Sequence, residues 1–321
     1  MRVPALTAAL TLLFASAVSC TSGTRSLSSP DGIADWHTHL SLESPGILDS
    51  LARHGVRLVR DCGGDLDSLL RWRQRIREGQ MNGPRLLIAG PLLDGPKPGA
   101  PYRLTVVDDA SAIAAVDSLA ARGVDFLKVH NAVPPGAFFT LLRRARTRGL
   151  PVAVHLPRGI AAWTAVDSGA GSIEHAAESL VASPIYAGLA RTPAEALAWW
   201  RSPAGDSVIA AWAARRIVVV PTLVRYEATL ATAPDSVRDQ RAALLPELLT
   251  LVGRMSRAGV RIAAGTDVAG VPGAPPAWRA VRRELELLAD AGLDASALRW
   301  ATSPASLDEW RAARYLRRAA P

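Results

Sequence analysis

From residue 33 onward, short apolar runs alternate with longer amphipathic stretches. The apolar runs have the length of buried strands, and the amphipathic stretches have the spacing of helices that bury one face. Strands that alternate with helices in this way predict βα units around a parallel sheet. We expect eight strands, at residues 33–39, 56–61, 85–89, 124–130, 151–155, 172–175, 217–221 and 261–265.

The number of these units predicts a particular α/β architecture. Eight strand-plus-helix units in about 260 residues match a (β/α)8 TIM barrel, which typically takes about 250. A doubly wound open sheet is the alternative, but no G-x-G-x-x-G motif follows the first strand. Two connections, 90–107 and 176–216, are long enough to shape a binding site, and the second should hold extra helices. The helix candidates include 65–78, 108–122, 135–148, 159–168, 234–258 and 276–291.

The first residues have the features of an export signal. A positive start at Arg2 is followed by an apolar run at 6–18 and by small residues that lead to Cys20. The run has about 13 residues, whereas a membrane-spanning helix needs about 20. The sequence AVSC resembles a bacterial lipobox, which implies cleavage before Cys20 and a lipid on its sulfur. Ordinary cleavage after Ala17 is the alternative, and it would release a soluble exported protein.

These features predict both the location and the organisation of the chain. We expect an exported lipoprotein, anchored in a membrane through Cys20 and facing the periplasm or the cell exterior. Residues 1–19 would be a lipoprotein-type signal peptide and 20–32 a linker. The barrel would occupy 33–305, and a helical tail would follow at 306–321.

Composition excludes some other classes of protein. With 49% hydrophobic residues the chain can bury a large core, which argues against disorder. The formal net charge is +8, but the basic residues are scattered over helix faces and aromatic residues are only 5%, so we expect no nucleic-acid partner. If Cys20 is acylated, Cys62 is the only other cysteine, and no disulfide can form within the chain. The sequence does not determine the oligomeric state.

The histidines gather at the ends of predicted strands. In a TIM barrel the catalytic groups come from the carboxyl ends of the strands. His37 and His39 are two residues apart, so both side chains project to the same side of the first strand. Each such residue by itself is more often structural, since strand-end histidines form hydrogen bonds and an aspartate after a strand caps the next helix. Together they predict a metal site, made of His37, His39, Lys128, His155, His175 and Asp267. Imidazole and carboxylate ligands without cysteine suit Zn²⁺ or a similar divalent ion.

Lys128 is the most informative of these residues. Of 37 basic residues only Lys97 and Lys128 are lysines, so arginine is used almost wherever a cation suffices. A lysine near a strand end usually extends its ammonium group to water. Beside two metal ions, however, a lysine with a depressed pKa can lose its proton and react with CO₂. The resulting carbamate is an anion with two oxygens that could bridge two metal ions, which arginine cannot provide.

These residues resemble the amidohydrolase superfamily, in particular its imidazolonepropionase-like and prolidase-like branch. The matching segments span most of residues 33–305 in the order of the family: DWHTHL, VRLVRDCGG, GVDFLKVH, PVAVHLP, GSIEHA, VVVPTLVRYE, AAGTDVAGVPG and ELELLADAGLDASALRWATSPA. The resemblance implies a binuclear metal centre. It assigns His37, His39 and Asp267 to one ion, His155 and His175 to the other, and carboxylated Lys128 to the position between them.

The sequence departs from the family pattern in two places. Members of this branch usually carry a small β-sandwich formed from segments before the first strand and after the last helix, and we expect a variant without it. The second departure is His130, on the same face as Lys128, where the family pattern does not lead us to expect a histidine. His130 could contact the substrate, act as an extra metal ligand, or belong to the core.

The resemblance implies a metal-dependent hydrolase that cleaves an amide-type C–N bond of a small-molecule substrate, with dipeptidase or prolidase activity as one form. A hydroxide that bridges the metals would attack the carbonyl, and Asp267 would pass its proton to the leaving group. Tyr226 could help to polarise the carbonyl oxygen, or could be a packed loop aromatic. Arg60 could bind a substrate carboxylate, although a structural ion pair with Asp61 or a neighbour is the stronger interpretation.

Three alternatives stay open. The same kind of centre hydrolyses lactones and phosphotriesters in related proteins, so the bond cleaved is not determined. A non-catalytic, membrane-tethered binding protein is a second possibility, against which the complete ligand set argues. A purely structural zinc site is the weakest, because closed structural sites favour cysteine.

Overall fold

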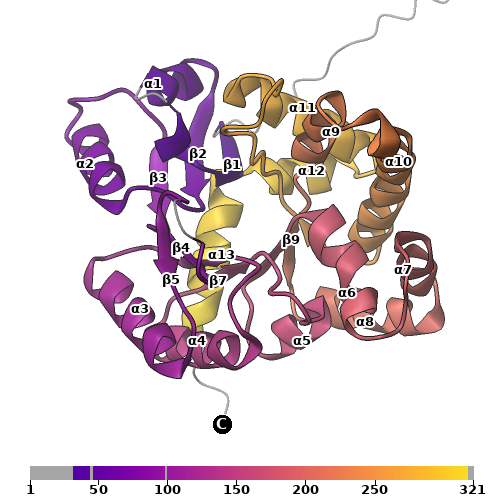
Figure 1. Ribbon diagram of the computed structural model, residues 1–321. Helices are drawn as coiled ribbons and strands as arrows, with labels where there is room; N and C mark the ends of the chain where they lie inside the picture. Colours follow the sequence, from indigo (N-terminus) through magenta and orange to yellow (C-terminus); the bar gives the residue numbers. More distant parts are fainter. Residues whose placement is uncertain (1–31, 44–45, 98–99, 317–321) are drawn as a thin grey trace, which may run out of the picture.

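Strands occupy the centre of the molecule and helices surround them (Figure 1). The computed structural model describes residues 32–43, 46–97 and 100–316, with side chains to residue 312. The predicted signal segment, Cys20 and the linker up to residue 31 lie outside these residues. Among the described residues, no helix combines the length and the apolar character that crossing a membrane requires.

All eight predicted strands are confirmed, most of them shorter by a residue or more than expected. Two further strands lie in the long connection 90–107, where we predicted none: β4 (Leu92–Asp94) and β5 (Arg103–Thr105). The others are β1 (Ile33–Thr38), β2 (Val56–Asp61), β3 (Arg85–Ile88), β6 (Leu127–Val129), β7 (Val152–Val154), β8 (Ser172–Glu174), β9 (Val218–Val220) and β10 (Arg261–Ile262).

Every strand pairing is parallel, as βα units require. One sheet has the order β1-β2-β3 and the other β10-β9-β8-β7-β6-β4-β5. β3 pairs with β2, and β4, which follows β3 closely in the chain, pairs with β6. At the other edge the Trp36 backbone N–H donates to the Ala264 carbonyl at 2.8 Å. The arrangement is consistent with the predicted (β/α)8 barrel.

The predicted helices are also present, with bounds that differ by a few residues. The connection 176–216 holds extra helices, as expected: α6 (Ala182–Tyr186), α7 (Pro193–Trp200) and α8 (Pro203–Ala214). The remaining helices are α1 (Gly46–Arg53), α2 (Leu66–Arg77), α3 (Asp109–Ala121), α4 (Pro135–Thr147), α5 (Ala162–Asp167), α9 (Leu223–Ala231), α10 (Asp235–Arg257), α11 (Ala277–Asp290), α12 (Ala295–Thr302) and α13 (Pro304–Leu316). A short 3-10 helix lies at Leu40–Leu42, and a π-helix lies at Ala176–Val181.

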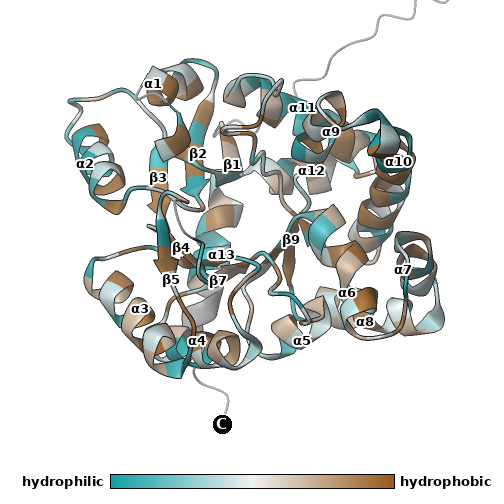
Figure 2. Ribbon diagram, viewed as in Figure 1, coloured by the Kyte–Doolittle hydropathy of each residue, from teal (hydrophilic) through white to brown (hydrophobic). Residues whose placement is uncertain are grey.

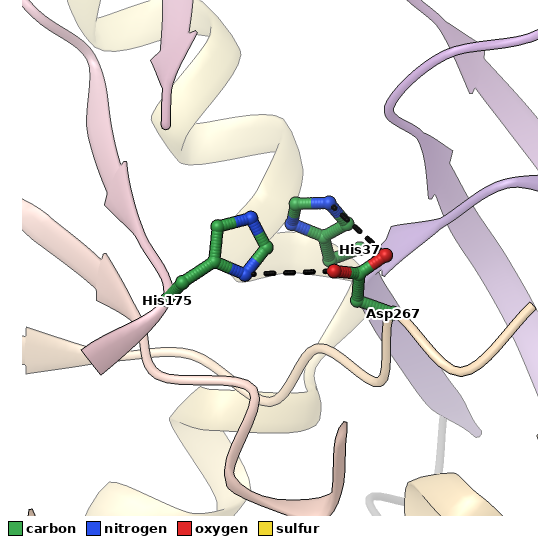
Figure 3. Close-up of side chains that lie close together, drawn as sticks. All are labelled: His37, His175 and Asp267. Carbon is green, nitrogen blue, oxygen red and sulfur yellow. Dashed lines mark ion pairs between the residues drawn. The ribbon is translucent and has the colours of Figure 1, made fainter. Parts of the chain in front are cut away.

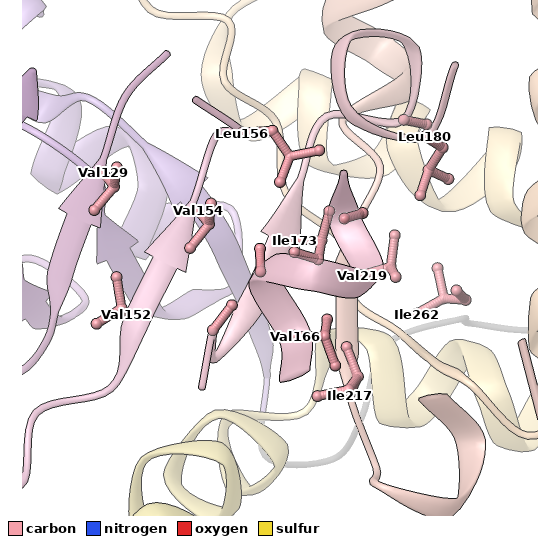
Figure 4. Packing of buried hydrophobic residues seen from close by; sticks show 14 of the residues in the cluster. Val129, Val152, Val154, Leu156, Val166, Ile173, Leu180, Ile217, Val219 and Ile262 are labelled. Carbon is pink, nitrogen blue, oxygen red and sulfur yellow. The ribbon is translucent and has the colours of Figure 1, made fainter. Parts of the chain in front are cut away.

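Alternation along the strands divides the core into two layers. Outward-facing residues such as Val154, Ile173 and Val219 pack against the helices (Figure 4). In Figure 2 most strand segments are apolar, whereas the surrounding helices mix apolar and polar positions. The inner layer consists of Ala34, Trp36, Leu58, Cys62, Leu87, Ala89, Phe126, Ala153, Val218, Val220, Ala263, Leu307 and Trp310.

Helix α13 belongs to the inner layer. Leu307 and Trp310 are buried there, and the helix crosses behind the strands in Figure 1. The predicted helical tail starts at residue 306, within this helix, whose Leu307 and Trp310 pack in the inner layer of the core. Apolar burial explains this packing, because these two side chains leave water by joining the inner layer of the core.

Candidate metal centre

A cavity of about 440 Å³ lies beside the carboxyl ends of the strands. The structure brings all six predicted metal ligands to its wall, although they come from strands and loops far apart in the sequence. Tyr102, Arg103, Glu178 and Arg225 also line the cavity, and the sequence did not single them out. The described residues around the cavity are His37, His39, Leu42, Gly63, Leu92, Pro101, Tyr102, Arg103, Lys128, His130, His155, His175, Glu178, Arg225, Asp267, Ala269, Gly270 and Val271, together with Ala100.

His37 lies within β1 and is completely buried. Its Nδ1 is 2.7 Å from a carboxylate oxygen of Glu174. Its Nε2 has no hydrogen-bond partner among the described residues and lies 3.8 Å from Oδ1 of Asp267 (Figure 3). Leaving a buried nitrogen unpaired is costly, so this atom points to a ligand at that position.

Nε2 of His39 is directed towards the same oxygen of Asp267 as Nε2 of His37. Its Nδ1 lies 2.9 Å from the Gly63 carbonyl oxygen, which can only accept, so Nδ1 carries the hydrogen. Nε2 lies 3.1 Å from Oδ1 of Asp267. The histidine pair thus presents two imidazole nitrogens to one carboxylate, as the two-residue spacing predicts.

Asp267 is held at the centre of the group by its backbone. Its φ of 49° is in the left-handed region, and its N–H donates to the His37 carbonyl at 2.8 Å. The chain approaches β1 closely here, since a Cβ on Gly265 would lie 2.8 Å from Cβ of His37. Burial disfavours the charged carboxylate, but the histidines and Arg225 outweigh it and hold the pKa of Asp267 well below its usual range.

His155 and His175 form the opposite side of the group. Their ring centroids are 4.7 Å apart, and the His175 ring is also 4.7 Å from that of His37. Nδ1 of His175 lies 3.0 Å from the Thr222 hydroxyl and 3.5 Å from Oδ2 of Asp267. Burial, and then the crowding of positive groups, lowers the pKa of both imidazoles well below the usual value. Both are therefore neutral at pH 7, which is the form that binds metal.

Lys128 is 1% exposed at the inner face of β6. Nζ of its ammonium group lies 3.4 Å from the Val129 carbonyl oxygen, which is a weak contact. Burial lowers the pKa of Lys128, because moving a charged ammonium group out of bulk water is unfavourable. The side chain thus fits the neutral amine that carboxylation requires.

His130 lies in the cavity wall, which favours a substrate contact over a core position. Its Nδ1 is 3.0 Å from Oδ2 of Asp94, and its ring is 4.6 Å from that of His155. Asp94 also forms an ion pair with Arg103 and accepts from the Ala132 backbone N–H. Through these contacts the Asp94 carboxylate connects β4 and β5, the two strands that the sequence did not predict, to the wall of the cavity.

Two predicted substrate-binding residues lie elsewhere. Tyr226 donates its hydroxyl to the Arg241 carbonyl at 2.9 Å and does not line the cavity, so the packed aromatic is the reading that fits. Arg60 is completely buried beneath the cavity and pairs with Glu174 at 2.7 Å, not with Asp61. A substrate cannot reach it, because the inner layer of the core surrounds its guanidinium.

A second group of potential ligands, His37, Cys62 and Glu174, does not fit a metal ion. The guanidinium of Arg60 already neutralises Glu174. Burial raises the pKa of the Cys62 thiol, which disfavours the thiolate that serves as a metal ligand. By contrast, His37, His175 and Asp267 place three ligand atoms within 4.8 Å of one another (Figure 3). The nitrogen and oxygen donors there fit a divalent metal.

Comparison with known proteins supports the fold. No protein-family model matches the sequence, and no curated protein matches it. Among solved structures, bottromycin amidohydrolase is 24% identical with a TM-score of 0.64, over 87% of this chain and 67% of that chain. A Xaa-Pro dipeptidase with methionine bound in its active site is 17% identical with a TM-score of 0.62, over 88% and 75%. A prolidase complexed with N-methylphosphonate-L-proline is 18% identical with a TM-score of 0.62, over 87% and 74%.

The similarity to these structures agrees with the resemblance that the sequence motifs indicate. They match along most of the chain. In its fold, the chain is similar to the amidohydrolases and prolidases that the sequence predicts.

Proposed function

We propose that the protein is a metal-dependent hydrolase that cleaves an amide-type C–N bond in a small molecule. The observation that carries this proposal is the convergence of four strand-end histidines, a buried lysine and an aspartate on one cavity. The unpaired Nε2 of His37 supports a ligand at their centre. The names of the similar structures, an amidohydrolase and a Xaa-Pro dipeptidase, support the type of bond.

The residues fit two divalent ions, for which zinc is the best match. When bound, such ions supply an activated water and polarise the carbonyl group of the substrate. The proposed ligands are His37, His39 and Asp267 for one ion, His155 and His175 for the other, and Lys128, carboxylated by CO₂, between them.

The residues around the cavity have separate tasks in this proposal. Asp267 accepts the proton of the attacking water and returns it to the leaving nitrogen. Arg225, whose Nε lies 3.2 Å from Oδ2 and whose Nη1 donates to the Asp267 carbonyl at 2.9 Å, holds this carboxylate in place. His130 is 19% exposed in the cavity wall and contacts the substrate. A cavity of about 440 Å³ suits a dipeptide-sized molecule.

Metal content measured by mass spectrometry tests the proposal first. The purified protein should carry two equivalents of zinc or a similar ion, and Lys128→Ala should lose most of it. Lys97→Ala is the matched control, because it removes the other lysine, which is exposed. Trace metal in the wild type, after purification with added zinc and bicarbonate and without chelators, would contradict the mechanism and favour a binding protein.

Asp267→Asn separates an enzyme from a binding protein. The amide keeps the shape of the side chain but cannot accept the proton, so turnover of a cleaved dipeptide should fall by about 10² to 10⁴. Asp308→Asn, at an exposed ion pair with Arg85, should leave turnover unchanged. Dipeptides, lactones and phosphotriesters belong in the same screen. Equal turnover in Asp267→Asn and the wild type would remove Asp267 from the proposed chemistry.

A further inference from the structure

A buried ion pair lies directly beneath the cavity and contacts His37. One oxygen of Glu174, Oε2, lies 2.7 Å from Nδ1 of His37 and 2.7 Å from Nη2 of Arg60. The other oxygen accepts from the Ser172 hydroxyl at 2.5 Å, and that hydroxyl accepts from Nη1 of Arg60 at 3.0 Å. Glu174 and Arg60 are both completely buried, so no water competes for these contacts.

This pair determines which nitrogen of His37 carries the hydrogen. An ionised carboxylate only accepts hydrogen bonds, and Arg60 keeps Glu174 ionised. Nδ1 of His37 must therefore be the donor. Nε2, which lies on the cavity side 3.8 Å from Asp267, is left with its lone pair free. In metal sites, a carboxylate behind a histidine fixes the tautomer and the orientation of the ring in this way.

Helix α13 holds the arginine from the opposite side. The central guanidinium carbon of Arg60 lies 4.9 Å from the ring centroid of Trp310, 5.3 Å from that of Phe126 and 5.5 Å from that of Trp36. Trp310 Nε1 also donates to the Gly171 carbonyl at 2.9 Å, immediately before β8. Because β8 carries Glu174, Trp310 restrains both members of the ion pair.

The cost of this arrangement suggests a purpose. Burying an arginine and a glutamate is often no better for stability than a well-packed apolar pair of similar volume. An apolar pair, however, could not accept a hydrogen bond from His37. The presence of the charged pair Arg60 and Glu174 is therefore explained by the orientation that it imposes on the His37 ring.

We propose that Glu174 and Arg60 are positioning residues that hold His37 as the Nδ1–H tautomer, with Nε2 directed to a metal ion. Trp310 keeps the pair in place, so the C-terminal helix supports metal binding without reaching the cavity. The inference rests on the proposed function in one respect, namely that His37 is a metal ligand.

Nitrogen NMR of the histidine rings in the metal-free full chain tests the tautomer. The His37 signals are assigned as those missing from His37→Asn. In the wild type they should show one tautomer with the hydrogen on Nδ1, whereas in Glu174→Gln, whose amide can donate or accept, they should show a mixture. Asp117→Asn is the matched control, because Asp117 is a partly buried carboxylate that pairs with Arg144 and Arg148 and contacts neither the histidines nor α13. A mixture already present in the wild type would overturn the proposal, whether or not the protein binds metal.

Zinc titration by calorimetry tests the consequence. Affinity in Glu174→Gln should fall by about 10- to 100-fold, the usual effect of removing such a partner. Asp117→Asn should bind as the wild type does. Equal affinities in all three proteins would contradict the positioning role, whereas a wild type that binds no zinc would contradict the proposed function instead.

A variant far from the cavity guards against misfolding of Glu174→Gln. Trp310→Leu keeps an apolar side chain on α13 but removes the ring from Arg60. Its zinc affinity should fall by between about twofold and thirtyfold, the range of coupling through packed side chains, with thermal unfolding still cooperative. Unchanged affinity would show that α13 only covers the end of the barrel.

Discussion

The four histidines of the candidate metal centre differ in pKa because their surroundings differ. Burial, opposed by Asp267 and Glu174, lowers the pKa of His37 to about 4. The pKa of His39, by contrast, is raised above its usual value. Burial acts to lower it, but the hydrogen bond to Asp267 and the charge of that carboxylate outweigh burial. His155 and His175 are neutral at pH 7 because both are buried beside other positive groups. Most of the imidazoles at the site can therefore accept a metal without first losing a proton.

Cys62 illustrates how burial suppresses reactivity. The thiol is completely buried, and desolvation raises its pKa, so little thiolate exists near neutral pH. We expect Cys62 of the folded protein to resist iodoacetamide at pH 8 and to react once the chain is unfolded in urea. Peptide mapping by mass spectrometry distinguishes it from Cys20, the other cysteine of the chain. Rapid labelling of Cys62 in the folded protein would contradict its burial.

At the scale of elements, one helix caps another beside the site. The Thr222 hydroxyl, which would normally cap α9, lies 3.0 Å from Nδ1 of His175 and makes no capping bond. Glu284 of α11 replaces it, accepting from the Val224 N–H at 2.7 Å. Two helices distant in sequence are thereby fixed to each other and to the cavity.

This cap makes stability depend on pH. Desolvation, the largest cause, raises the pKa of Glu284 from its ordinary value of 4.5 to about 8. Between these values the folded protein binds a proton that the unfolded chain does not, so stability falls as pH rises through this window. The free energy of unfolding of wild type relative to Glu284→Gln should fall by about 1.4 kcal/mol per pH unit there. Urea unfolding at pH 5, 6, 7 and 8 measures the difference, and a constant difference would exclude the raised pKa.

Helix α13 should contribute strongly to stability. Leu307 is completely buried in the inner layer of the core. Leu307→Ala should lower the free energy of unfolding by about 2–5 kcal/mol, because it removes apolar contacts and leaves a cavity. Leu189→Ala, at a side chain that is 53% exposed, is the control and should change it by less than about 0.5 kcal/mol. Similar urea midpoints for the two variants would show that α13 is not part of the core.

At the scale of the whole molecule, the proposed metal ligands connect strands that are far apart in the sequence. Residues 37 and 267 meet across the junction of the first and last strands, where the Asp267 N–H donates to the His37 carbonyl. Lys128, His155 and His175 come from the strands between. A metal bound to this set restrains segments that are far apart in the chain.

Removal of metal should therefore lower the temperature of unfolding. A ligand that binds only the folded protein stabilises it by about 2.7 kcal/mol at a concentration one hundred times its Kd. We expect EDTA to lower Tm and added zinc to restore it in the wild type, with a much smaller response in Lys128→Ala. Differential scanning calorimetry measures both. A wild-type Tm that responds to neither reagent would argue against a bound metal.

The sequence by itself determined the strands, the class of fold and the metal-site candidates. Periodicity is local, and a histidine at the end of a parallel strand has only one edge of the sheet to occupy, so six candidate ligands could be placed together without coordinates. The preference for arginine over lysine also drew attention to Lys128, because composition can be counted from the sequence without any structure.

Only the tertiary structure decided which neighbours these residues meet. Glu174 lies next to a predicted ligand in the sequence, but its contact with His37 and its pairing with Arg60 depend on three strands coming together. Arg225 reaches Asp267 while Tyr226, the next residue, turns to Arg241, because adjacent helical residues face different directions. Strands β4 and β5 and the insertion of Trp310 likewise depend on packing across the barrel, and contacts between distant residues leave no periodic trace in a single sequence.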